Sequence, residues 1–194
     1  MEAFLVPAGV VALAEIGDRT QLLALVLAAR YRNKVPVIAG ILVATLVNHT
    51  LAAFIGTTVV KWLGPDLLRW VLALSFFAMA VWTLLPDRLT AGAGAADGPK
   101  RGGAFGTTVV LFFLAEMGDK TQIATIALAA RYGSLAAVIA GTTCGMLLAD
   151  VPVVLLGDRF AARLPAPALH LIAALVFAAF GAVVLMGRSG GLLG

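Results

Sequence analysis

One short pattern occurs twice in the sequence, and each copy combines two acids with one base. The first copy is Glu15-Ile16-Gly17-Asp18-Arg19-Thr20-Gln21, and the second is Glu116-Met117-Gly118-Asp119-Lys120-Thr121-Gln122. Both copies lie inside apolar stretches that are long enough to cross a bilayer. Ionisable side chains at that depth are energetically costly, so by default they mark a functional site.

The acids of the pattern suit a hard divalent cation. Glu15 and Asp18 are three residues apart, as are Glu116 and Asp119, and this spacing puts each pair on one face of a helix. If the two copies meet, their carboxylates supply the all-oxygen ligand set that Ca²⁺ and Mn²⁺ accept. Zinc is a weaker candidate, because the chain has one Cys and two His without zinc-site spacing. We therefore predict a metal site at these four acids.

Neighbouring residues of the pattern can assist such a site. The glycine of each copy weakens the helix, and a local break there would expose backbone carbonyls to an ion. Side chains that could add neutral oxygens are Thr20, Gln21, Thr121 and Gln122.

An alternative interpretation is a local ion pair within each copy. Glu15 precedes Arg19 by four residues, and Glu116 precedes Lys120 by four, which is the favourable order on a helix. Arg19 and Lys120 would then be the charge partners of the glutamates, and the pattern would have the structural role of holding neighbouring helices together. This interpretation leaves both aspartates unexplained. With Asp150 included, the apolar stretches hold five acids against two bases, a surplus that requires a cation or protons.

The composition indicates an all-α integral membrane protein. The 194 residues are 61% hydrophobic and only 12% charged, about half the charged fraction of soluble domains. The net charge of +4 does not point to nucleic acid, because basic loop residues normally orient membrane proteins. A single cysteine excludes a disulfide framework, and no residue pattern calls for a prosthetic group.

The hydrophobic stretches predict six transmembrane helices. Each stretch approaches or exceeds the roughly 20 residues that a crossing helix needs. The predicted spans are residues 4–29, 35–60, 67–85, 104–130, 135–156 and 168–187. The composition of the polar segment between the third and fourth spans is typical of a flexible linker. We therefore expect a first three-helix unit at 1–85, a cytoplasmic linker at 86–103 and a second three-helix unit at 104–194.

The two halves are copies of one another. Ala14–Gly56 aligns with Ala115–Gly157 without a gap, and the identities continue well past the pattern itself. Three spans are an odd number, so the second half must enter the membrane from the opposite side. We expect two inverted three-helix repeats, which in many transporters place the substrate site at the membrane midplane.

The loops predict the orientation of the chain. Most loop Lys and Arg residues fall on the side that holds the 86–103 linker, which favours that side as the cytoplasmic one. Both termini would then lie outside the cytoplasm. We see no leader or transit peptide, which favours a bacterial cell (inner) membrane.

Two further ionisable residues occupy one equivalent position in the halves. His49 in the second predicted span aligns with Asp150 in the fifth. A proton relay or an accessory metal ligand would explain both residues. Hydrogen bonding between helices is the alternative.

The doubled pattern fits E-x-G-D-[KR]-[ST] and resembles the signature of a membrane family that includes Golgi calcium/manganese transporters and bacterial manganese exporters. The similarity covers the six spans, the two halves and the central linker. It implies a cation/proton antiporter that exports Mn²⁺, Ca²⁺ or both from the cytosol, with the acids of the pattern as the ion site. His49 and Asp150 lie outside the signature.

Other classes of protein remain as alternatives. An exporter of small organic solutes could use a similar scaffold, although its site would need a more apolar pocket. A passive cation channel is a second alternative, and a deep cluster of acids favours tight binding over fast conduction. An enzyme is not expected, because a phosphate-handling site needs a phosphate-binding loop or a basic cluster at the membrane interface near its acids. Here the acids are expected at mid-depth, far from the basic loops. The sequence leaves the oligomeric state open.

Overall fold

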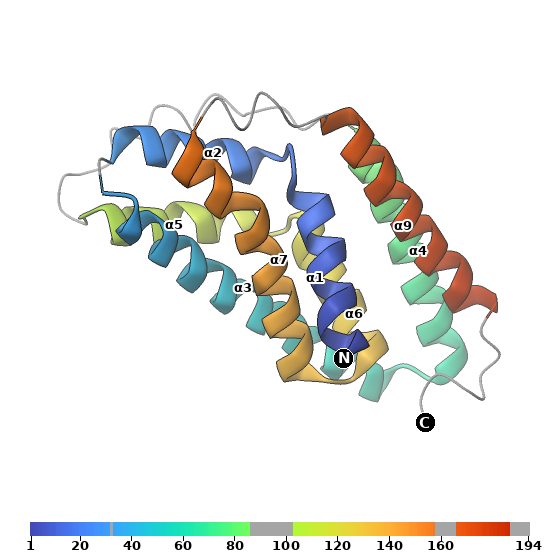
Figure 1. Cartoon of the computed structure of the whole chain (residues 1–194). Helices are drawn as coiled ribbons and strands as arrows, with labels where there is room; N and C mark the ends of the chain where they lie inside the picture. Colours follow the sequence, from blue (N-terminus) through green and yellow to red (C-terminus); the bar gives the residue numbers. More distant parts are fainter. Residues whose placement is uncertain (32, 86–102, 158–165, 187–194) are drawn as a thin grey trace.

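The structure is a computed structural model that describes residues 1–31, 33–85, 103–157 and 166–186. Within these ranges all regular secondary structure is α-helical, which confirms the predicted class (Figure 1). The predicted 86–103 linker lies outside the described residues except for Gly103. The helices are α1 (Glu2–Glu15), α2 (Arg19–Arg30), α3 (Val35–Trp62), α4 (Pro65–Leu84), α5 (Gly103–Glu116), α6 (Lys120–Tyr132), α7 (Leu135–Leu156) and α9 (Ala166–Met186).

Four helices are long and apolar enough to cross a membrane: α3, α4, α7 and α9. They correspond to the second, third, fifth and sixth predicted spans, and α7 has the predicted bounds. The first and fourth predicted spans are each divided into two helices. Helices α1 and α5 have 14 residues each, which is about 21 Å against a hydrocarbon thickness of about 30 Å.

Glycine divides both of these spans at the repeated pattern. Gly17 has φ 84° and Gly118 has φ 79°, a left-handed conformation that ends an α-helix and that favours glycine. Asp18 and Asp119 then cap new helices, which begin at the following residue, so α2 leaves α1 and α6 leaves α5 in a different direction (Figure 1). The helix break that the glycines suggested is present. It separates Glu15 in α1 from Asp18 at the N-cap of α2, so the expectation that these two acids share one helix face is wrong.

The two halves of the chain pack into one another. Helix α1 of the first half packs against α7 of the second, and α5 of the second half packs against α3 of the first. The sequence alignment makes α1 equivalent to α5 and α3 equivalent to α7, so these two contacts correspond. Helices α4 and α9 form a further pair beside this assembly (Figure 1).

Equivalent glycines bring these helices together. A Cβ atom at Gly141 of α7 would meet the carbonyl of Phe4 in α1. A Cβ atom at Gly40 of α3 would lie 3.0 Å from the carbonyl oxygen of Phe105 in α5. Small residues therefore let the backbones approach, as is common between helices in membranes.

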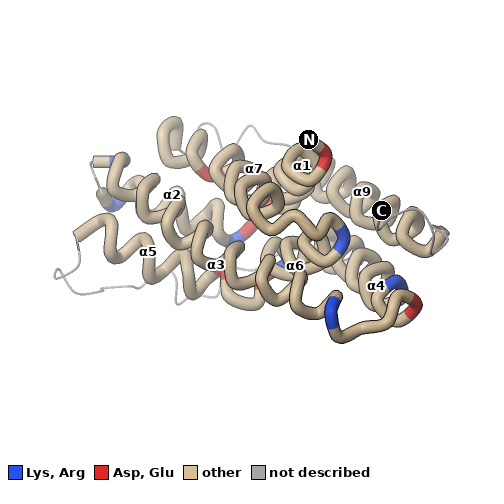
Figure 2. The backbone as a smooth tube through the Cα atoms, turned by 90° about the horizontal axis from the view of Figure 1, so that it is seen from below, with Lys and Arg blue, Asp and Glu red and all other residues tan. Residues whose placement is uncertain are grey.

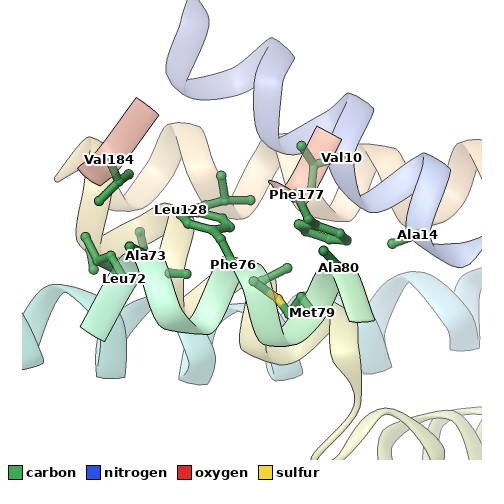
Figure 3. Packing of buried hydrophobic residues seen from close by; sticks show 14 of the residues in the cluster. Val10, Ala14, Leu72, Ala73, Phe76, Met79, Ala80, Leu128, Phe177 and Val184 are labelled. Atoms are coloured by element: carbon green, nitrogen blue, oxygen red, sulfur yellow. The ribbon is translucent and has the colours of Figure 1, made fainter. Parts of the chain in front are cut away.

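A cluster of apolar side chains fills the space between α4, α9, α6 and α1. Figure 3 shows Phe76, Phe177, Leu128 and Val10 among its members. Other large apolar side chains face outward, as for a protein solvated by lipid; Phe54, Leu74 and Leu175 are each 61% exposed.

The glycine contacts give a prediction about stability. Gly141→Ala should destabilise the protein by about 1–3 kcal/mol, because the new methyl group meets backbone that cannot rotate away. Gly9→Ala is the matched control: Gly9 also lies in a helix, but a Cβ there meets nothing within 4 Å. That control should be neutral or stabilising by up to about 1 kcal/mol. Thermal unfolding of the purified variants in detergent measures both; equal effects would contradict the packing.

Candidate metal centre

The two helix breaks meet inside the protein. Figure 2 shows charged residues at the outer ends of helices and also in one group at the centre of the assembly. Glu15, Asp18 and Asp119 are buried there, and each offers a carboxylate oxygen within 4.8 Å of the others. Three of the four predicted ligands are thus brought together from both copies of the pattern.

The fourth predicted ligand, Glu116, is equally buried but lies outside this group of three. It is close enough to Asp119, Asp18 and Asp150 to interact with their charges. The cluster therefore has a compact part made by three acids and a fourth acid beside it.

The helix ends around the cluster influence its charge. Glu15 ends α1 and Glu116 ends α5, so two C-terminal ends with their partial negative charge point into the site. Asp18 and Asp119 sit at the N-cap positions of α2 and α6, where partial positive charge favours a carboxylate. The breaks thus bring two helix C-terminal ends, whose partial charge favours a cation, close to two carboxylates at helix N-terminal ends.

The ion pairs of the site run between the two copies of the pattern. Lys120 Nζ lies 3.2 Å from Asp18 Oδ1, and an Arg19 guanidinium nitrogen lies 3.1 Å from Asp119 Oδ1. Each base thus pairs with an aspartate of the other copy, which the interpretation as a local ion pair did not predict. The i,i+4 geometry requires a continuous helix, and the glycine break removes it. Asp18 and Asp119, which the local interpretation left without a partner, are the acids that pair with the bases.

The two crossed pairs differ in exposure. The Lys120 side chain is 1% exposed and its partner Asp18 is 0% exposed. The Arg19 side chain is 37% exposed, while Asp119 is 2% exposed. The Lys120–Asp18 pair is therefore fully buried, whereas the Arg19–Asp119 pair has its base partly exposed at the edge of the site.

A threonine of each copy holds the glutamate across the break. The Thr121 hydroxyl donates a hydrogen bond of 2.9 Å to Glu116 Oε2, and the Thr20 hydroxyl donates to Glu15 Oε1. The second oxygen of each glutamate is buried and accepts no hydrogen bond from the described residues. Each glutamate is therefore oriented by one oxygen and keeps the other for a cation or a proton.

The glutamines of the pattern use their oxygens within the fold. Gln21 Oε1 accepts a hydrogen bond of 2.9 Å from Gly17 N–H, and Gln122 Oε1 accepts one of 2.8 Å from Gly118 N–H. These oxygens, predicted as accessory ligands, face the backbone of the breaks.

The aligned pair His49 and Asp150 is also buried. Neither ring nitrogen of His49 and neither carboxylate oxygen of Asp150 has a hydrogen-bond partner in the part of the chain that the structure describes. Asp150 lies near enough to Glu15 and Glu116 to interact with their charges. The structure therefore adds Asp150 to the surroundings of the cluster and places His49 on the equivalent part of α3.

One contact of the site was not expected from sequence. His170 of α9 lies with Nε2 3.0 Å from the carbonyl oxygen of Ile16 in the first break. His170 lies outside the repeated pattern, near the start of the last predicted span. Its position depends on how α9 packs beside α1, which no local pattern encodes.

Known proteins are similar to both halves of the chain. The family model described as divalent cation/proton antiporter GDT1 matches residues 3–91 and 104–191, one segment for each copy of the pattern. No solved structure matches the chain.

Three curated relatives are similar over most of their length. A Vibrio cholerae protein named "Putative manganese exporter" is 51% identical over 168 residues, covering 86% of this chain and 82% of the relative. A GDT1-like protein of Synechocystis is 29% identical and covers 89% and 91% of the two chains. GDT1-like protein 5 of Arabidopsis thaliana is 29% identical and covers 87% and 89%. The chain belongs to the divalent cation/proton antiporter GDT1 family.

Proposed function

We propose that this protein exports Mn²⁺, Ca²⁺ or both from the cytosol in exchange for protons. The observation that carries this proposal is the convergence of Glu15, Asp18 and Asp119 from two helix breaks into one buried group. Carboxylate oxygens are the ligands that these ions prefer. The name of the Vibrio cholerae relative supports Mn²⁺ as a substrate. The site works by binding and release and makes no covalent bond.

The charges of the site support exchange of one metal ion for two protons. Five buried carboxylates, Glu15, Asp18, Glu116, Asp119 and Asp150, meet the two bases Arg19 and Lys120. Full ionisation therefore leaves three negative charges in excess. One divalent cation with one proton neutralises them, and so do three protons without the cation. Exchange in this ratio keeps the buried charge constant, which matters because uncompensated charge is costly in lipid.

The crossed ion pairs act as counter-charges of the empty site. Asp18 and Asp119 are both members of the metal group and both partners of a base from the other copy. An arriving cation competes with Lys120 and Arg19 for these aspartates. When the cation leaves, the bases pair with them again, so the carboxylates are not left bare during the return step.

The membrane arrangement that we propose follows the sequence repeats. Residues 1–85 and 104–194 form two inverted three-helix repeats, in which α1 with α2 and α5 with α6 each make one broken span. Both termini lie outside the cytoplasm of a bacterial cell membrane. The reciprocal packing of α1 on α7 and of α5 on α3 supports this symmetry. Rocking of the repeats around the site would open it to one side at a time.

The aspartates provide the first test of function. Asp18→Asn and Asp119→Asn should each reduce Mn²⁺ flux in proteoliposomes by about tenfold or more, because each removes a charged ligand while preserving shape. Asp66→Asn is the matched control, since the Asp66 side chain is 84% exposed and far from the cluster in sequence. Wild-type flux in a folded Asp18→Asn or Asp119→Asn protein would contradict the proposed site.

The coupling to protons provides a second test. Metal and protons share the same oxygens, so binding of Mn²⁺ should release about two protons per ion at neutral pH. Calorimetric titration in two buffers of different ionisation enthalpy counts them. Metal affinity should fall as the pH falls, and an acidic exterior should drive metal export from vesicles. Release of no protons, with flux indifferent to the pH gradient, would indicate a channel or uniporter instead.

The crossed pairs provide a third test. Lys120→Met should destabilise the protein by about 3–5 kcal/mol because it leaves Asp18 buried without its base. Arg19→Met should cost less, since the arginine is partly exposed. Adding Asp18→Asn to Lys120→Met should restore most of the thermal stability in detergent. If Glu116→Gln restores as much or more, Lys120 belongs to the glutamate of its own copy and the crossed assignment fails.

A further inference from the structure

The two glutamines of the repeated pattern each join a helix break to a helix of the other half. Gln21 accepts a hydrogen bond from Gly17 N–H and donates one of 3.2 Å from Nε2 to the carbonyl of Ala149 in α7. Gln122 accepts a hydrogen bond from Gly118 N–H and donates one of 2.7 Å from Nε2 to Asn48 Oδ1 in α3. Both polar ends of each amide are therefore engaged.

These two connections are equivalent under the sequence repeat. Gln21 aligns with Gln122, and Ala149 aligns with Asn48. The acceptor is a backbone carbonyl in one copy and a side-chain amide in the other, whereas the glutamine and its bond to glycine are the same. The common element is the glutamine, which indicates that its bridging role does not depend on one local acceptor.

The position of each bridge matters for the acids. Gly17 immediately precedes Asp18, and Gly118 immediately precedes Asp119, so the glycine N–H belongs to the backbone that carries the metal-binding aspartate. Within a break this N–H has no helical carbonyl to bind, and the glutamine supplies the acceptor. The first bridge ends at Ala149, which precedes Asp150, and the second ends at the residue before His49. Each bridge therefore fixes the backbone of a break against a helix that carries one of these two ionisable residues.

In the second copy the bridge continues to a third helix. Asn48 Nδ2 donates a hydrogen bond of 3.3 Å to the carbonyl of Phe113 in α5. Asn48 is fully buried, so this amide has no access to water as an alternative partner. The chain from Gln122 through Asn48 to Phe113 therefore ties α6, α3 and α5 together beside the site.

We propose that Gln21 and Gln122, with Asn48, are positioning residues that set the metal affinity of the centre. They hold the two breaks at the spacing at which Glu15, Asp18 and Asp119 converge, and they do so without contacting the ion. This inference rests on the proposed function of the cluster as a divalent cation site.

Equilibrium binding of Mn²⁺ to the purified full-length protein in detergent tests the inference. Gln21→Met and Gln122→Met keep the length of the side chain and remove its hydrogen bonds. Each should weaken Mn²⁺ binding by about two- to tenfold, the equivalent of one net hydrogen bond. In proteoliposomes the KM for Mn²⁺ should rise by the same factor, while the rate at saturating metal stays within about twofold.

Double variants distinguish a bridge from a general loss of structure. Gln122→Met combined with Asn48→Leu should weaken Mn²⁺ binding by less than the product of the two single effects, because both substitutions remove the hydrogen bond between Gln122 and Asn48. Gln21→Met combined with Asn48→Leu is the matched control, and its two effects should multiply, since Gln21 bonds to Ala149 instead. Asn48→Leu leaves the pattern intact and carries the test if Gln122→Met does not fold.

Unchanged Mn²⁺ affinity in folded Gln21→Met and Gln122→Met proteins would overturn the inference while leaving the carboxylate site in place. Multiplying effects of Gln122→Met and Asn48→Leu would overturn it as well. If the wild-type protein bound neither Mn²⁺ nor Ca²⁺, the proposed function would fail first, and this inference with it.

Discussion

The structure depends on one constraint: negative charge is buried where no water can solvate it. Five carboxylates are withdrawn into the interior of an apolar helical protein, and two bases from opposite copies of one pattern compensate part of that charge. Such an arrangement is stable only if the remaining charge is balanced by protons or by a cation. Membership of a divalent cation/proton antiporter family is consistent with this constraint.

The glycine breaks bring the buried charged groups together in one site. A continuous helix would have paired each base with the glutamate of its own copy and left both aspartates without a base. Because Gly17 and Gly118 redirect the chain, the bases reach across and the acids of both copies face one cluster. The pairing between halves means that neither half can form the site alone. It also links any movement of one half to the charged groups of the other half.

The sequence predicted the helical class, four of the spans, the helix break at the pattern and the membership of the family. Hydrophobic length and a repeated acid-glycine-acid pattern are local features, so they can be read without a structure. The partners of Arg19 and Lys120 could not be predicted, because they depend on the direction in which the chain leaves each glycine. The contacts of Gln122 with Asn48 and of His170 with Ile16 depend on packing between distant helices, and they have no local signal.

We propose that one divalent cation binds between the two helix breaks. Anomalous scattering from crystals of the Mn²⁺-loaded protein tests this most directly. We expect a single strong peak coordinated by Glu15, Asp18 and Asp119, with Lys120 and Arg19 drawn away from their aspartates. A peak held by one copy of the pattern alone, or a peak remote from both breaks, would contradict it.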